Sequence, residues 1–201
     1  MQFNLSESAK TLKASEIREI LKITERPEII SFAGGLPAPE LFPIDELLSI
    51  STNVLKNEGR IALQYSPTEG YLLLREMIAK QLMSKAHVTT IAQDVLITSG
   101  SQQGIDFCAK IFLNDGDTII CEDPSYLGAI NVFNAHHAKY VTIPMDNDGM
   151  IIDELEKVLS SGVKAKFIYV IPDFQNPSGV ASGYFRQRPP RHLAFYRTLH
   201  G

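Results

Sequence analysis

Three short polar stretches of the chain carry side chains that could bind a flat, anionic ligand. They are residues 99–102 (Ser-Gly-Ser-Gln), 123–126 (Asp-Pro-Ser-Tyr) and 173–179 (Asp-Phe-Gln-Asn-Pro-Ser-Gly). Each follows an apolar run short enough to be a buried strand. Small polar groups at the start of a helix can hold an anion, and an aromatic ring offers a planar ligand a face for stacking. The three stretches together therefore predict a site for a planar, phosphorylated ligand.

The first stretch joins an expected strand to an expected helix. Residues 95–98 are apolar or β-branched, and an apolar series at helical spacing begins at Ile105. The turn between them delivers Gly100 and Ser101 to the start of the helix, where backbone N–H groups lack partners and the helix dipole is positive. On this segment alone, the better interpretation of Ser101 is a simple N-cap.

The other two stretches also have ordinary explanations. Tyr126 could simply begin a helix, and Asn176-Pro177 is a common turn sequence. In an open α/β sheet, however, ligands bind in the crevice beyond the carboxyl ends of the strands. Three independent coincidences are less probable than one shared site, so the joint interpretation is favoured.

The elements that would position these stretches alternate along the chain. A helix is expected from Ser15, and helices follow at 45–57 and 71–85, with loops at 33–39 and 64–70. Strands are expected at 95–98, 118–121, 140–143 and 167–171, with a helix at 126–135 and another capped by Asp153 and Glu156. Nearly continuous apolar strands between helices predict an α/β fold, with a mostly parallel sheet covered on both faces.

Composition excludes several classes of protein. The 201 residues are 44% hydrophobic and carry a net charge of −4, which argues against nucleic-acid binding. The sequence contains no run of 18 apolar residues and begins without a signal-peptide pattern, so we expect no membrane partner and a cytoplasmic location. Cys108 and Cys121 are expected to be small core residues. His136 and His137 lack ligands at metal-binding spacing, which predicts no metal site.

Five loops, taken together and in order, resemble those of the class I/II aminotransferases. They are 33–37 (Ala-Gly-Gly-Leu-Pro), 64–70 (Gln-Tyr-Ser-Pro-Thr-Glu-Gly), 100–104 (Gly-Ser-Gln-Gln-Gly), 123–126 and 176–179 (Asn-Pro-Ser-Gly). The subgroup they most resemble comprises the α-aminoadipate, kynurenine and aromatic amino acid aminotransferases. These are fold type I enzymes that use pyridoxal 5′-phosphate. The resemblance covers residues 1 to about 180.

The resemblance implies a role for six residues. Ser101 and Gln102 would bind the cofactor phosphate. Tyr126 would stack on the pyridine ring, and Asn176 would donate a hydrogen bond to the 3′ oxygen of that ring. Tyr65 would reach the phosphate bound in the other subunit of a homodimer, and the backbone of Gly35 would face the substrate carboxylate.

The resemblance also implies groups that lie beyond this sequence. In the family, the lysine that forms the Schiff base, the acid opposite the pyridine nitrogen and the arginine for the substrate carboxylate all follow the Asn-Pro-Ser-Gly loop. Lys164 and Lys166 precede an expected strand and lack the family's Ser-x-Ser-Lys context. We therefore assign no catalytic residue, and we expect a truncated chain that is inactive alone and is poorly soluble or only partly ordered.

The last 21 residues look unlike the family. Residues 184–201 hold four of the eight arginines and none of the eleven lysines. This change in basic residues suggests translation in another reading frame after about Val180. The rival explanation is a genuine divergent terminus.

The expected domain organisation has three parts. Residues 1–40 would form an arm of the small domain with the substrate loop, 41–180 the first part of the cofactor-binding large domain, and 181–201 a non-family tail. The expected activity of the family is amino transfer between an amino acid and a 2-oxo acid. The alternatives are a non-catalytic fragment or dimerisation partner of a full-length aminotransferase, and a β-lyase that uses the same cofactor. A regulator with a DNA-binding module has little room before residue 15.

Overall fold

The computed structural model describes residues 37–83 and 88–183, together with residues 4, 6, 9–10 and 28–29. The chain forms two compact units, one made of Ala14–Thr98 and the other of Met1–Lys13 and Ser99–Gly201. The expected helix from Ser15, the loop that contains Gly35 and the tail from residue 184 lie outside the described residues.

The Ala14–Thr98 unit is helical in its described part. The short η1 (Pro39–Leu41) precedes the long helix α3 (Ile44–Ala62), which confirms the helix expected at 45–57 and extends it. The helix expected at 71–85 is α4 (Leu72–Met77), which continues as a π-helical segment, η2 (Ile78–Met83). None of the described helices is both long and apolar enough to cross a membrane.

The apolar stripe of α3 is exposed. Leu47, Leu48 and Leu55 lie on it and are each more than half exposed, and no residue of the helix is buried. An amphipathic helix of this kind gains most of its stability when its apolar face packs against another element. Within the described residues, α3 has no such packing partner.

The expected strand at 95–98 is wrong. This segment is extended, but a strand needs a neighbouring strand, and these residues are assigned to none of the described strands. Ile97 N donates to Glu69 O, in the preceding loop, at 3.0 Å. The segment is instead held by Arg75, a buried side chain of α4. The Arg75 guanidinium donates to Val95 O at 2.8 Å and to Ala92 O in the short helix η3 (Ala92–Asp94) at 2.8 and 3.1 Å.

The second unit contains a four-stranded sheet in the order β3-β2-β1-β4. The strands are β1 (Thr118–Asp123), β2 (Lys139–Asp146), β3 (Gly149–Met150) and β4 (Ala165–Tyr169). Strand β1 pairs in parallel with β2 and with β4, whereas β3 turns back antiparallel on β2. The helices of this unit are α5 (Ser101–Phe112), α6 (Leu127–Ala135) and α7 (Ile152–Ser160).

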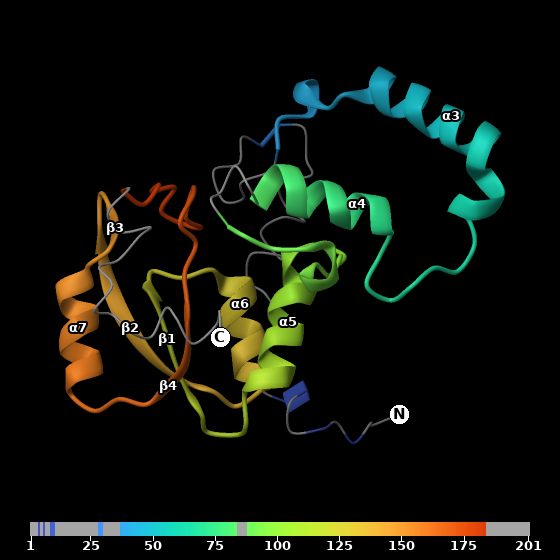
Figure 1. Cartoon of the computed structure of the whole chain (residues 1–201). Helices are drawn as coiled ribbons and strands as arrows, with labels where there is room; N and C mark the ends of the chain where they lie inside the picture. The colour runs from blue at the N-terminus through green and yellow to red at the C-terminus, as the bar shows by residue number, and fades with distance from the viewer. Residues whose placement is uncertain are drawn as a thin grey trace. The chain divides into compact units, whose positions relative to one another are not determined.

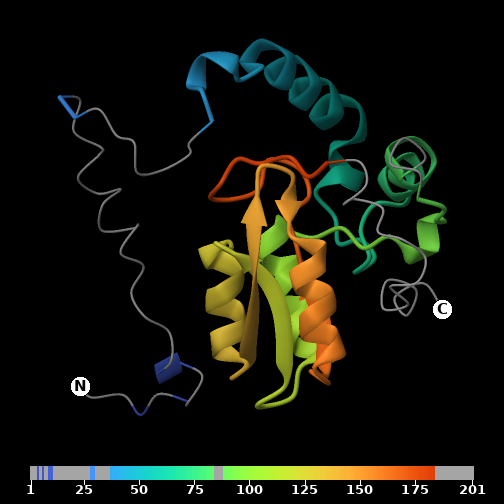
Figure 2. The same cartoon turned by 90° about the vertical axis from the view of Figure 1, so that its left-hand side faces the viewer.

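Helices cover both faces of this sheet, as the sequence predicted (Figures 1 and 2). On one face Ile119 packs with Phe133 of α6 and with Ala109 of α5. On the other face Ile120 packs with Leu155 of α7. Because successive side chains of a strand point to opposite faces, the two adjacent isoleucines of β1 supply both cores.

Two local expectations are wrong. Asp153 does not cap α7: the helix begins one residue earlier, Ile151 is its N-cap, and Asp153 lies in the first turn. The chain leaves β3 directly into this helix, so an apolar residue occupies the cap position. Cys121 is buried in β1 as expected, but Cys108 is exposed on α5, where it borders an open groove.

A core substitution tests this packing. Phe133 is 1% exposed, and its ring lies with its centroid 5.6 Å from those of both Phe167 and Tyr169. We expect Phe133→Ala to lower the free energy of unfolding by about 3–5 kcal/mol, measured by chemical denaturation. The matched control is Phe174→Ala, because Phe174 is 82% exposed, and it should cost less than about 0.5 kcal/mol. Equal losses in the two variants would contradict the assigned core.

Candidate functional site

The polar stretches of the second unit gather at one edge of its sheet. Strands β1 and β4 are parallel, so their carboxyl ends lie on the same side. Helices α5 and α6 begin at this edge, and the segment that follows β4 passes over it (Figures 1 and 2). This carboxyl edge is where ligands bind in open α/β sheets.

Helix α5 begins with an arrangement suited to an anion. Gly100 is its N-cap, with φ +81°, and makes no side-chain hydrogen bond to the first turn. Ser101 is therefore the first residue of the helix, and its interpretation as an N-cap is wrong. Glycine tolerates this left-handed conformation, whereas a side chain would be strained there. The first turn of a 12-residue helix thus presents its backbone N–H groups and its positive dipole end at the carboxyl edge.

Gln102 and Tyr126 lie against each other beside this turn. Gln102 Nε2 donates to Gly128 O at 3.0 Å, and Tyr126 Oη lies 3.5 Å from Gln102 Oε1. A Cβ on Gly128 would overlap Tyr126 Cζ and lie 2.6 Å from Gln102 Oε1. The absence of a side chain at residue 128 therefore leaves the space that both groups occupy. The structure brings together two residues that were predicted from different stretches.

The third stretch is tied to the second by a buried glutamine. Gln175 is 1% exposed. Its Nε2 donates to Pro124 O at 2.8 Å and to Glu122 Oε2 at 3.2 Å. Pro124 is two residues before Tyr126, and Gln175 is next to Asn176, so this side chain holds the two predicted loops side by side. Asn176 itself is exposed.

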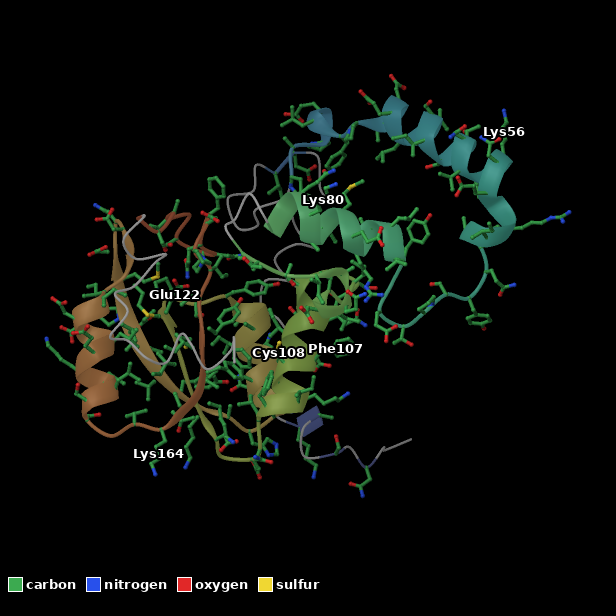
Figure 3. All side chains as sticks on the ribbon, viewed as in Figure 1. Lys56, Lys80, Phe107, Cys108, Glu122 and Lys164 are labelled. Atoms are coloured by element: carbon green, nitrogen blue, oxygen red, sulfur yellow. The ribbon has the colours of Figure 1, made fainter. Side chains whose placement is uncertain are left out.

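Glu122 is a buried carboxylate inside this arrangement. It is 1% exposed, and its Oε2 also accepts a hydrogen bond from Ile171 N at 3.2 Å. Burial raises the pKa of this carboxyl group, and the hydrogen bonds from Ile171 and Gln175 partly oppose the rise. Figure 3 labels Glu122 on the sheet.

Neighbouring groups share this dry environment. Burial raises the pKa of the Cys121 thiol and raises the pKa of Tyr169 to about 12. Ser125 Oγ is buried beside the Cys121 thiol, and its interaction with that thiol partly opposes the rise in the thiol pKa.

The lysines near the sheet lie at the opposite edge. Lys164 immediately precedes β4, and Lys166 is its second residue, so both are at the amino end of that strand. Figure 3 labels Lys164. Lys166 Nζ lies 3.4 Å from Asp117 Oδ2 in an ion pair. Gln102 and Tyr126 lie instead at the carboxyl edge, where α5 and α6 begin.

The structure does not relate two of the predicted residues to this cluster. Tyr65 belongs to the Ala14–Thr98 unit and is fully exposed there. Gly35 lies outside the described residues.

The two adjacent histidines follow α6, and each faces one aspartate. His136 Nε2 lies 3.7 Å from Asp106 Oδ1, and His137 Nδ1 lies 2.9 Å from Asp115 Oδ1. No group of three metal-binding side chains occurs in the described part of the chain.

Sequence reasoning missed Glu122, Gln175 and Gly128. The sequence rarely indicates that a glutamate or glutamine is buried, because residues of these types are usually exposed. Glu122 at the end of a buried strand was the available signal, since burying a carboxylate requires partners. Nothing in the sequence marked Gly128 as a contact point.

An apolar groove runs beside this site. It has a volume of about 360 Å³ and lies between α5 and the sheet, with Ile105, Cys108, Phe133 and Tyr169 among its lining residues. Strand β4 has no partner on its outer side within the described residues. The groove and this free strand edge are adjacent features of the same side of the unit.

Comparison with known proteins identifies the family. The family model described as aminotransferase class I and II matches residues 43–182. The chain therefore belongs to the class I and II aminotransferase family.

Curated relatives agree with this assignment. A 2-aminoadipate transaminase of Thermus thermophilus is 46% identical over 85% of this chain and 41% of its own length. An aromatic-amino-acid aminotransferase of Thermococcus litoralis is 42% identical over 94% of this chain and 46% of its own length. The chain thus spans less than half the length of these relatives.

Solved structures match over the same portion. A Thermus thermophilus α-aminoadipate aminotransferase, solved with N-(5′-phosphopyridoxyl)-L-leucine, has a TM-score of 0.80 at 40% identity and is covered over 47% of its length. A kynurenine aminotransferase of Pyrococcus horikoshii has a TM-score of 0.85 at 39% identity and is covered over 48%. The fold is therefore part of a fold type I aminotransferase fold.

Gly128→Ala tests the contact at the start of α6. The added methyl group must displace the Tyr126 ring and the Gln102 amide, which are both rotatable side-chain ends. We expect a loss of only about 1 kcal/mol in the free energy of unfolding, together with shifted ring resonances of Tyr126 in NMR spectra. Gly59→Ala is the control, because nothing lies within 4 Å of its added Cβ. Unshifted Tyr126 resonances would contradict the assigned contact.

The raised pKa of Glu122 predicts a pH dependence. The folded chain holds this proton to higher pH than the unfolded chain, whose glutamate has a pKa of about 4.3. The contribution of protonated Glu122 to the free energy of unfolding is complete below the unfolded pKa. It is lost as the pH rises through the folded pKa. We expect Glu122→Gln to remove this loss, so that the stability of the variant relative to the parent rises as the pH increases above about 4.3. Glu58→Gln, at an exposed position, should show no such gain in parallel denaturation curves.

Proposed function

We propose that this chain supplies the cofactor-binding part of a pyridoxal-phosphate-dependent aminotransferase. The whole protein would transfer an amino group between an amino acid and a 2-oxo acid. The observation that carries the proposal is the convergence of Gln102, Tyr126 and the Asn176 loop at the carboxyl edge of the sheet. The family membership of residues 43–182 supports it.

The groups at this edge fit the chemistry of pyridoxal phosphate. The first turn of α5 offers backbone N–H groups and a positive dipole end to the phosphate. Tyr126 offers an aromatic face, and Gly128 has no Cβ that would fill the space beside it. Asn176 is exposed and can donate an amide hydrogen bond. When bound, the cofactor supplies an electron sink for bond changes at the substrate α-carbon.

Each residue then has a distinct task. Ser101 and Gln102 hold the phosphate at the helix start, and Gln102 also keeps the Tyr126 hydroxyl in place. Tyr126 orients the pyridine ring by stacking on it. Asn176 donates to the ring oxygen and so favours its ionised form, because a hydrogen bond to the charged form stabilises that form. The protein thereby sets the position and charge of the ring, and the cofactor supplies the reactivity.

The proposal includes a homodimer in a reducing, cytoplasmic setting. Tyr65 is fully exposed, as a residue must be if it is to reach a phosphate bound in a second subunit. Gly35 keeps its proposed role at the substrate carboxylate. Both cysteines are free, as expected where thiols stay reduced. The proposed amino donors belong to the class for which the two curated relatives are named, 2-aminoadipate and aromatic amino acids.

Binding of a cofactor analogue tests the proposal. The probe is 4′-deoxypyridoxine 5′-phosphate, which has the ring and the phosphate but no aldehyde, so that surface lysines cannot trap it. We expect the 201-residue chain to bind it in calorimetry. Tyr126→Ala should weaken binding about tenfold, because stacking on an aromatic face contributes about 1 kcal/mol or more.

Tyr71→Ala is the matched control, since Tyr71 is an exposed tyrosine outside the predicted site. Its affinity should equal that of the parent chain. A parent chain that fails to bind the probe, or a Tyr126→Ala variant that binds as tightly as the parent, would overturn the proposal.

A further inference from the structure

We propose that Gln175, anchored by Glu122, is a positioning residue that sets Tyr126 and Asn176 at the separation required by one flat ligand. The inference rests on the proposed function of this edge. Gln175 is too buried to touch a ligand in the site, so it would act through the two loops that it joins.

The hydrogen bonding of the Gln175 amide is saturated. Its Nε2 donates to Glu122 Oε2 and Pro124 O, and its Oε1 accepts from Ser178 N at 2.9 Å and from Ser178 Oγ at 2.7 Å. A carboxamide offers two donor hydrogens and two acceptor lone pairs, so no capacity remains. A buried amide with four partners has little freedom to move.

The partners also determine which way the amide faces. Pro124 O can only accept a hydrogen bond, and Ser178 N can only donate one. Rotating the amide by half a turn would set oxygen against oxygen and N–H against N–H. The orientation is therefore fixed by chemistry, and with it the order of the two loops on either side of the side chain.

Glu122 anchors this amide to the sheet. It lies in β1, and its Oε2 also accepts from Ile171 N, two residues after the end of β4. One carboxylate oxygen thus ties β1, the segment after β4 and Gln175 together. The neighbouring backbone bonds of Gln175, from its N to Val180 O at 2.8 Å and from Gly179 N to its O at 2.5 Å, close the Asn176 loop on itself.

Gln175 connects the two loops close to the residues that would face the ligand. Pro124 is two residues from Tyr126, and Asn176 is adjacent to Gln175, so the path between the two ligand-facing side chains runs through this amide. Without it, each loop keeps its own local bonds but loses the link to the other. The stacking face and the amide donor would then no longer be held at a fixed separation.

Comparing the affinities for the cofactor analogue and for inorganic phosphate separates a positioning role of Gln175 from a merely structural one. A phosphate alone would need only the start of α5, whereas the ring of the analogue needs Tyr126 and Asn176 together. We expect Gln175→Ala to weaken binding of 4′-deoxypyridoxine 5′-phosphate about tenfold and to leave the affinity for inorganic phosphate within about twofold. Both are measured by calorimetry on the 201-residue chain.

Hydrogen exchange provides a second readout that needs no ligand. In Gln175→Ala, amide exchange should become faster both in 176–179 and in 124–127, because the link between the loops is lost. Faster exchange confined to 176–179, with unchanged selectivity between the two ligands, would overturn the inference. Failure of the parent chain to bind the analogue would overturn the proposed function, and the exchange measurement would still decide whether the link exists.

Substitutions that change the charge at residue 175, and one that removes an exposed amide elsewhere, complete the test. Gln175→Glu places a second carboxylate against Glu122 and removes the amide that donates to Pro124 O, so it should weaken analogue binding. Adding Glu122→Gln relieves the repulsion between the carboxylates but does not restore the bond to Pro124 O, so binding of the analogue should stay weak. Gln93→Ala removes an exposed amide elsewhere and should change neither affinity. If Gln175→Ala does not fold, as judged by circular dichroism, the double variant Gln175→Glu with Glu122→Gln takes its place, because it also lacks the donor to Pro124 O. Binding of the analogue by that double variant as tightly as by the parent would count against the inference.

Discussion

The buried hydrogen bonds between Glu122 and Gln175 are the constraint on which the carboxyl edge of this sheet depends. A carboxylate and an amide placed out of water cost free energy unless their partners are in place. Here each partner comes from a different segment: the strand β1, the turn before α6, the backbone after β4 and the Asn176 loop. The polar groups therefore stabilise one arrangement of these segments and penalise others.

The two apolar cores place that polar cluster. Ile119 and Ile120 point to opposite faces of β1, so α5 and α6 cover one side and α7 covers the other. This packing determines where helices α5 and α6 begin, and hence where the first turn of α5 and the Tyr126 ring lie. The same burial that holds the sheet raises the pKa values of Glu122 and Tyr169. Burial against the sheet is therefore the common cause of the packing and of the raised pKa values at this edge.

The exposed apolar surfaces show how the chain relates to its family. It spans less than half the length of the relatives that it matches. The apolar stripe of α3, the free edge of β4 and the groove between α5 and the sheet are all exposed in the described residues. Each is a surface of the kind that normally packs against another element.

Local patterns in the sequence determined the order of most helices and strands and the run of apolar residues in β1 that supplies both cores. They also determined which polar and aromatic residues follow the strands at the carboxyl edge. The helix expected at 126–135 is present as Leu127–Ala135, because its signals are local. Tertiary structure alone decided that Gln175 and Glu122 meet, since they are 53 residues apart in the chain. It also decided that residues 95–98 form no strand and that Cys108 is exposed. A strand exists only when a neighbour pairs with it, and burial depends on what packs above a side chain, so neither property is contained in the segment itself.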